Sequence, residues 1–344
     1  MSLPGVVLRK IKGRLARVGG RTPPPPAAVP AGHPMAFDPA TLPWLDRERA
    51  DIAGYVAALD PAQRPRFDLA EKLEHWRRFG YVVFPKLIPE ALIDAYRADL
   101  ADLVAQRAHH RSRVLIEGVG IKAIRDATDE ELRHPHARIM DFHNQSVAAK
   151  RIILHPDIVA FLGHVFRDRV VAMQTLTFWR GSEQWTHQDF AYVVSRIPSH
   201  LAATWVALED VHPDAGPLEY FPGSHRLPVF DFGNGMFLTP ESTMTDIDFR
   251  DFLEGEAAKA GLALQCFAPR KGDVLFWHAA LAHRGGTVKD SGLTRLSLVT
   301  HYSSATGYPT DRRAPGSKPR ILEYNGGWVY ADPTLRGDED RFSR

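Results

Sequence analysis

A His-Gln-Asp tripeptide at residues 187–189 carries the side chains of this chain whose types and spacing best suit metal chemistry. In an extended segment, residues two apart point to the same side, so His187 and Asp189 can direct an imidazole nitrogen and a carboxylate oxygen at one point. A third ligand could come from His278 or His283, which lie far downstream. Two histidines and one carboxylate with open positions suit a non-haem Fe(II) oxygenase, although a His-x-Asp pair alone is common in proteins.

Strand-like segments fill the second half of the chain and are expected to position these residues. They cover residues 170–179, 201–208, 273–277 and 293–302, with Gly and Pro clusters between them. Because no helical pattern separates each pair, we expect antiparallel pairing in a sandwich or barrel rather than a doubly wound sheet. The candidate metal residues are therefore expected inside a β barrel.

The first half of the folded part is predicted to be mostly helical. Asp68, followed three residues later by Glu71, is typical of a capping box and predicts the start of a helix. Residues 109–150 show weak periodicity, and an insertion of that length can contribute to a substrate lid. Further elements are expected at residues 81–84 (a strand), after Pro89 (a helix) and at residues 157–166 (a helix).

The composition is that of an ordinary globular protein of 344 residues, with 44% hydrophobic and 24% charged residues. No apolar run is long enough to span a bilayer. The single cysteine, Cys266, excludes an internal disulfide framework and fits a reducing compartment, so we expect a cytoplasmic protein. We expect Cys266 to be a core residue of a strand at residues 262–267.

The net charge of +2 conceals a basic N-terminal tail. Residues 1–36 contain six basic residues and no acidic residue, whereas the remainder contains 37 basic and 41 acidic residues. Apolar residues recur at helical spacing in the tail, which suits a basic amphipathic helix in weak contact with a membrane surface. A transit-like leader and a frayed terminus are the alternatives. The prolines of residues 23–34 predict a stiff linker, so the folded part is expected to begin near Asp38.

Four features of the chain occur in a specific order and spacing: the tripeptide 187–189, the segment Gly216 to His225 (GPLEYFPGSH), the segment Gly272 to His278 running on to His283, and Arg295. Together they resemble the phytanoyl-CoA dioxygenase family of Fe(II)/2-oxoglutarate oxygenases, and the likeness extends from about Phe67 to Tyr302. The resemblance implies a fold that is mainly β with added helices, around a double-stranded β-helix or jelly-roll core.

This fold implies one oxygenase domain after an N-terminal tail and linker. We divide the chain into the tail and linker (1–37) and the domain (38–344), which comprises a mostly helical part (38–166), the jelly-roll core (167–304) and a C-terminal extension (305–344).

The resemblance makes His187, Asp189 and His283 the expected iron ligands, because the family pattern places the third ligand before a Gly-containing turn. His278 is then expected near the mouth of the site as a core residue, and it stays the alternative ligand. Arg284 is a mild departure, since the family often has a small residue at this position. No catalytic residue is predicted beyond the metal centre.

The resemblance also implies 2-oxoglutarate as co-substrate and O2 as oxidant. The distal carboxylate of 2-oxoglutarate requires a permanently charged planar group, which makes Arg295 its expected partner. On a strand, Ser297 would share the face of Arg295 and could bind the same carboxylate. Gln174 and Trp205 lie on strands where family members place co-substrate contacts, with core packing as the alternative for both. His225 is either a turn-stabilising residue or a substrate contact.

The activity that the resemblance implies is hydroxylation of an unactivated C–H bond in a small-molecule metabolite, with release of succinate and CO2. The presence of Asp189 disfavours halogenation, whereas desaturation and ring formation stay open. A Zn-dependent hydrolase with the same ligands and a non-catalytic jelly-roll binding module are the alternatives from other classes. We expect no nucleic-acid partner. Residues 113–145 and 227–261 are the segments expected to select the substrate.

Overall fold

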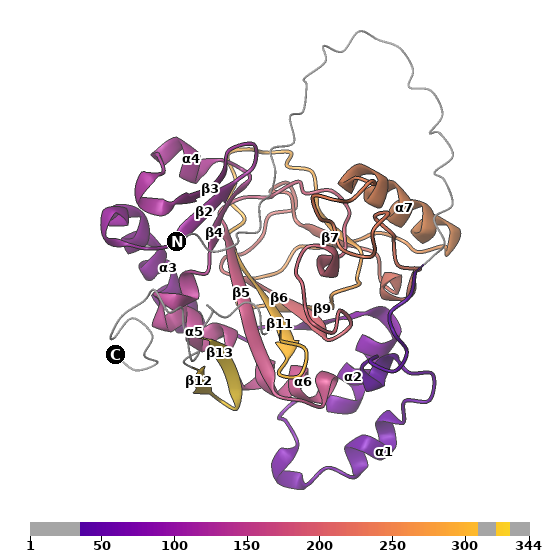
Figure 1. Cartoon of the computed structure of the whole chain (residues 1–344). Coiled ribbons are helices and arrows are strands. Elements are labelled where there is room, and N and C mark those ends of the chain that lie inside the picture. The colour runs from indigo at the N-terminus through magenta and orange to yellow at the C-terminus, as the bar shows by residue number, and fades with distance from the viewer. Residues whose placement is uncertain (1–34, 309–320, 331–344) are drawn as a thin grey trace, which may run out of the picture.

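The computed structural model describes residues 35–308 and 321–330, so the basic tail and most of the Pro-rich linker lie outside the described residues. The described residues form two sheets with helices around them (Figure 1). None of their helices is long and apolar enough to cross a membrane. The cytoplasmic location and the membrane contact of the tail stay predictions.

The larger sheet has ten strands, and nearly all of its pairs are antiparallel. Its main path runs in the order β1 (Tyr81–Phe84), β9 (Val274–His278), β6 (Leu201–Ala207), β11 (Ser297–Ser304), β5 (Val170–Phe178), β4 (Ala137–Met140), β2 (Arg113–Ile116) and β3 (Gly120–Ala123). Two further strands attach to β5, namely β13 (Gly327–Tyr330) and, beyond it, β12 (Ile321–Tyr324). The smaller sheet has the order β10 (His283–Gly285), β7 (Leu218–Tyr220) and β8 (Gln265–Phe267). The fold is mainly β with added helices around a jelly-roll core, as predicted.

The helices precede or interrupt these strands. They are α1 (Ile52–Ala57), α2 (Leu69–Phe79), α3 (Glu90–Ala105), α4 (Asp129–Arg133), α5 (Val147–Ile153), α6 (Pro156–Phe166) and α7 (Asp246–Lys259). Short 3-10 turns are η1 (Trp44–Asp46), η2 (Pro61–Gln63), η3 (Arg107–His109), η4 (Ile124–Asp126), η5 (Phe142–Asn144), η6 (Asp189–Ala191) and η7 (Ser224–Arg226). Asp68 caps α2 by accepting a hydrogen bond of 2.9 Å from the backbone N–H of Glu71, so this helix begins where the sequence predicts.

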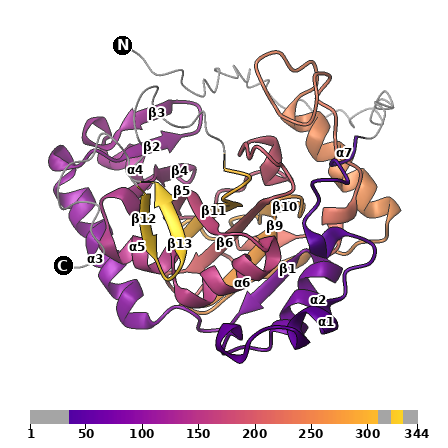
Figure 2. The same ribbon diagram turned by 60° about the horizontal axis from the view of Figure 1, so that its bottom comes forward.

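Helices cover one face of the larger sheet, which we call the outer face (Figure 2). Alternate residues of the central strands point to this face, as the period of two requires. Val206, Phe276 and Leu298 pack there with Trp76 of α2 and Phe161 of α6 in one buried apolar cluster. This cluster anchors the helical part of the chain to the sheet.

The opposite face of the larger sheet, which we call the inner face, packs against the smaller sheet. Trp205, Trp277 and Val299 of the larger sheet form a second buried cluster with Tyr220 and Phe267 of the smaller sheet. The space between the two sheets is therefore withdrawn from water along β9, β6 and β11. Polar side chains that reach this space must find partners, because an unpaired buried polar group is costly.

The structure differs from the sequence prediction at residues 109–150 and at Cys266. Residues 109–150 contain the strands β2, β3 and β4, which extend the larger sheet beyond β5. Each of these strands has only four residues, too few to show a clear period in the sequence. The prediction that Cys266 belongs to the core is wrong: its side chain is exposed, because neighbouring residues of a strand face opposite sides and it is Phe267 that packs between the sheets.

Candidate metal centre

His187 and His283 face each other across an isolated antiparallel bridge. The backbone N–H of each histidine donates to the carbonyl of the other, at 2.9 and 3.0 Å. In such a pair both side chains project to the same side, and the two imidazole centroids lie 4.3 Å apart. The bridge thus brings a histidine from the second sheet to the His-Gln-Asp tripeptide.

Asp189 reaches the same point from a turn rather than from a strand. The backbone is extended at Gln188, and Asp189 is the first residue of η6, so the prediction of one continuous extended segment is wrong. Oδ1 of Asp189 nevertheless lies 3.7 Å from Nε2 of His187 and 3.6 Å from Nε2 of His283. All three side chains are buried, and one candidate ligand atom from each lies within 4.8 Å of the others.

Backbone carbonyls fix the orientation of both imidazole rings. Nδ1 of His187 lies 2.7 Å from the carbonyl of Trp185, and Nδ1 of His283 lies 2.9 Å from that of Leu281. With Nδ1–H donating to these carbonyls, the Nε2 lone pair of each ring is free for a metal. Burial and the neighbouring His283 lower the pKa of His187 to about 3, so its ring is neutral. Burial alone would raise the pKa of Asp189, but the nearby histidines, above all His283, lower it, so the carboxylate is ionised.

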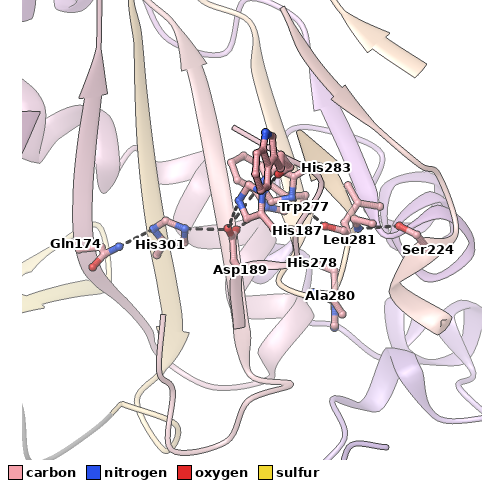
Figure 3. Close-up of polar contacts among 12 residues, drawn as sticks. Gln174, His187, Asp189, Ser224, Trp277, His278, Ala280, Leu281, His283 and His301 are labelled. Carbon is pink, nitrogen blue, oxygen red and sulfur yellow. Dashed lines mark hydrogen bonds and ion pairs between the residues drawn. The ribbon is translucent and has the colours of Figure 1, made fainter. Parts of the chain in front are cut away.

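The second oxygen of Asp189 is held by residues that the sequence did not single out (Figure 3). Oδ2 accepts a hydrogen bond of 2.7 Å from Nε1 of Trp277 and lies 3.3 Å from Nε2 of His301. Gln174 approaches Nδ1 of His301 with its amide nitrogen at 3.2 Å, which leaves Nε2–H to face the carboxylate. Oδ2 is therefore occupied, and Oδ1 is the oxygen that faces the histidines. Strand alternation could have placed Trp277 on the inner face, but only the register of β11 with β5 brings His301 opposite Gln174.

Arg295 and Ser297 are buried residues with unsatisfied donors, and we call this pair the anion pocket. Arg295 is 2% exposed, and its Nη1 donates to the carbonyl of Gly216 at 2.9 Å. Nε of Arg295 and Oγ of Ser297 are buried without a hydrogen-bond partner among the described residues. Arg295 lies two residues before β11 begins at Ser297, so both side chains enter from the start of one strand. Such orphaned donors fit an anion that the chain itself does not supply.

Arg138 of β4 is a second, half-buried cation beside this pair, and sequence reasoning missed it. It pairs directly with Phe178 of β5, and the guanidinium carbons of Arg138 and Arg295 lie 5.6 and 5.9 Å from the centre of the Phe178 ring. Nε of Arg138 is also without a partner among the described residues. Burial and the nearby Arg138 lower the pKa of Arg295 to about 10, so it stays cationic at neutral pH. Two neighbouring guanidinium groups, each with a buried Nε that lacks a partner among the described residues, favour an anionic ligand such as a carboxylate.

The other predicted site residues lie in two different surroundings. Trp205 is buried on the inner face, with its ring 5.7 Å from the guanidinium carbon of Arg295, so it packs against the anion pocket. His278 is buried away from the metal residues, where its Nε2 lies 3.2 Å from Oδ2 of Asp46. Nδ1 of His278 accepts a hydrogen bond from the backbone of Ala280, so both ring nitrogens are engaged. His225 lies beside His278, with ring centroids 5.6 Å apart.

Helix α7 is fastened to the chain neighbours of both metal-facing histidines. Glu254 of α7 accepts a hydrogen bond of 2.6 Å from the hydroxyl of Thr186, which precedes His187, and lies 3.5 Å from Arg284, which follows His283. Arg284 also donates to Glu219 of β7 at 2.7 Å. These contacts explain why residue 284 is an arginine here rather than the small residue common in the family, because Arg284 joins α7 to the smaller sheet.

Comparison with known proteins agrees with this geometry. The family model described as phytanoyl-CoA dioxygenase (PhyH) matches residues 76–295. The peroxisomal phytanoyl-CoA dioxygenases of Homo sapiens and Rattus norvegicus are 22% and 23% identical over 68% of this chain and 68% of each relative.

Solved structures show the same fold. The epimerase SnoN from nogalamycin biosynthesis, in complex with Fe3+, alpha ketoglutarate and nogalamycin RO, has a TM-score of 0.54 at 23% identity, over 81% of this chain and 98% of its own. EctD from S. alaskensis with bound Fe has a TM-score of 0.54 at 17% identity, over 72% of this chain and 80% of its own. The family match covers more than half of the sequence and the resemblance is confirmed: the chain belongs to the phytanoyl-CoA dioxygenase (PhyH) family and is a 2-oxoglutarate-dependent non-haem iron oxygenase.

Proposed function

We propose that His187, Asp189 and His283 hold Fe(II), and that the enzyme hydroxylates an unactivated C–H bond of a small-molecule substrate. The observation that carries this proposal is the convergence of two free Nε2 atoms and one carboxylate oxygen on a single buried point. Two histidines and one carboxylate with open positions suit Fe(II) in oxygenases. The carboxylate at residue 189 argues against halogenation, because the related halogenases lack it.

The unsatisfied donors of the anion pocket support it as the binding site of the co-substrate carboxylate. Arg295 and Ser297 each offer a buried donor without a partner, and a carboxylate accepts from both. We assign them to the distal carboxylate of 2-oxoglutarate, with Arg138 adding positive charge from the other side of Phe178. Trp205 packs on Arg295 and holds the guanidinium in place.

Bound iron, with 2-oxoglutarate and O2, supplies the oxidising power for attack on the C–H bond. The residues of this chain bind the iron and the co-substrate, orient the substrate, and exclude water from the site. Trp277 and His301 fix the rotation of the Asp189 carboxylate, so that one oxygen faces the metal position. The amide nitrogen of Gln174 supports His301, and a contact of Gln174 with the co-substrate stays a prediction.

The test is an anaerobic titration of the purified chain with Fe(II) and 2-oxoglutarate, in which the weak visible band of keto-acid chelation to iron is recorded. We expect the band in the native protein, its loss in His283→Ala, and a right-shifted 2-oxoglutarate titration in Arg295→Ala. Iron binding without the band in the native protein would overturn the proposed roles of these residues. Detection of the hydroxylated product after O2 is admitted would separate hydroxylation from desaturation or ring formation.

A further inference from the structure

The inner face of the larger sheet continues well beyond the metal centre. In antiparallel pairs, directly opposed residues have their side chains on the same face. One such row crosses five strands from β11 to β3, through Ser297, Phe178, Arg138, Leu115 and Ile121. The face that carries the anion pocket at Ser297 is therefore the same face that carries Ile121 at the sheet edge.

The neighbouring row follows the same course, one pair closer to the metal centre. It runs through Val299, Leu176 and Met140. Two residues further along β11 and β5 from Val299 and Leu176 lie His301 and Gln174, which contact each other, and His301 contacts Asp189. The apolar surface thus begins next to the residues that hold the metal-facing carboxylate.

This part of the inner face is open, in contrast to the outer face of the same strands. Ile121 is 42% exposed and Leu115, Met140 and Leu176 are partly exposed, whereas Val114, which points to the outer face between them, is fully buried. Leu115, Ile121 and Met140 belong to no apolar cluster of the described residues. The cluster beneath the smaller sheet reaches β5, where Phe178 belongs to it and Leu176 packs against it, but no residue of β4, β2 or β3 belongs to it.

We propose that this open surface, the apolar shelf (Leu115, Ile121, Met140 and Leu176), binds the apolar body of the substrate, a hydrocarbon chain or a fused ring system. The proposal rests on the function proposed above, since it places the substrate relative to the metal centre. Strands lie about 4.8 Å apart, so the shelf offers roughly 15–20 Å of apolar surface from β5 to the far side of β3. Contiguous exposed apolar surface next to a reactive centre is typical of a ligand site.

Charge on the shelf agrees with this occupant. Arg138 stands in the first row between Phe178 and Leu115, and it marks the boundary between the anion pocket and the shelf. Beyond it the two rows end in Ile121 and Ala123, with Arg113 the remaining cation, paired with Asp141 at 3.3 Å. A substrate that lies here meets Leu176, Met140, Leu115 and Ile121 along a path that passes between Arg138 and Arg113, and its polar end is expected nearer to Arg138.

The chain supplies a matched pair of variants to test the shelf. Ile121 and Ile321 are both strand isoleucines with 42% and 40% exposure, but Ile321 lies on β12, which is joined through β13 to the opposite end of β5 from β4. The probe is the neutral apolar dye N-phenyl-1-naphthylamine, titrated by fluorescence into the intact chain loaded anaerobically with Fe(II) and 2-oxoglutarate. We expect Ile121→Lys to weaken dye binding about ten-fold and Ile321→Lys to leave it within about two-fold.

Further measurements keep the shelf separate from the metal proposal. Met140→Gln keeps the side-chain length but adds polarity, and it is also expected to weaken dye binding. This second variant tests the shelf even if Ile121→Lys fails to fold. The iron and 2-oxoglutarate band is expected unchanged in both variants. Equal dye binding by Ile121→Lys and Ile321→Lys would overturn the shelf, and a fall in Tm of Ile121→Lys without weaker dye binding would show that the chain itself covers this face. If the native protein showed no band but its dye binding still depended on Ile121, the proposed function alone would be overturned.

Discussion

Among the described residues, two clusters of histidine and aspartate can be compared, and only one of them is arranged for a metal. In the first, His187 and His283 direct free Nε2 atoms at one oxygen of Asp189. In the second, His278 uses Nε2 toward Asp46 and Nδ1 toward the backbone of Ala280. The residue types are alike in both clusters, and the histidines of both are buried.

The difference lies in what occupies the second nitrogen of each ring. A backbone carbonyl takes Nδ1–H in the first cluster, so each ring keeps a free lone pair on the inner side. In the second cluster the carboxylate of Asp46 is itself the partner of Nε2, so the ring has no lone pair left. A metal site therefore depends on which hydrogen bonds the histidines already make, and a structural cluster is one whose donors and acceptors satisfy each other.

The largest expected effect separates the two clusters directly. His283→Ala should abolish iron binding and 2-oxoglutarate turnover, because it removes one of three ligands. His278→Ala should retain iron at native stoichiometry and lose stability instead. Iron analysis of the two purified variants, alongside their melting temperatures, makes the comparison. The reverse result would mean that His278 is the ligand.

Loss of the charge that faces the co-substrate comes next. Arg295→Ala should weaken 2-oxoglutarate binding by about 3–5 kcal/mol, roughly 10²–10⁴-fold in Kd, because a buried charged pair loses one partner. Arg295→Lys should bind with intermediate affinity, since lysine keeps the charge without the planar fork. Iron binding in the absence of 2-oxoglutarate is the control and should stay unchanged. Equal 2-oxoglutarate Kd values for native protein and Arg295→Ala would remove Arg295 from this role.

Removal of a hydrogen bond to Oδ2 of Asp189 should have a smaller effect, on iron affinity. Trp277→Phe removes the indole donor to Oδ2 of Asp189 and should weaken iron binding about 10–100-fold, as is common for residues that orient a metal ligand. Trp76→Phe is the control, because Trp76 is equally buried but packs on the outer face. Iron Kd values measured under anaerobic conditions decide the matter, and a similar loss in both variants would point to general destabilisation.

The smallest effect is expected in the second cluster, as a pH dependence of stability. Burial alone would raise the pKa of Asp46, but the interaction with His278 outweighs it and leaves the pKa lowered. The ionised carboxylate therefore stabilises the fold at neutral pH, and this contribution is lost as the pH falls below about 4. Asp46→Asn should cost about 1–2 kcal/mol at pH 7. Denaturant melts should show the gap to the native protein closing toward acid pH; a gap that widens there would contradict the assignment.

The sequence by itself determined the fold class, the family and the set of residues that face the metal position. The core strands are long and apolar enough to show their pattern, and the tripeptide, the Gly-Pro and Pro-Gly-Ser-His segment and Arg295 keep a specific order along the chain. The short strands β2, β3 and β4 were not predicted from the sequence, because they are stabilised by pairing with the sheet rather than by local preference.

Only the tertiary structure decided how these residues are used. The bridge between His187 and His283, the turn that carries Asp189 and the contact of His301 with its carboxylate all join residues that are far apart in sequence or depend on strand register. Burial then decides the chemistry, since the same imidazole is a free ligand or a satisfied donor according to which carbonyl or carboxylate lies against its second nitrogen. That choice depends on long-range packing, and no local pattern in the chain encodes it.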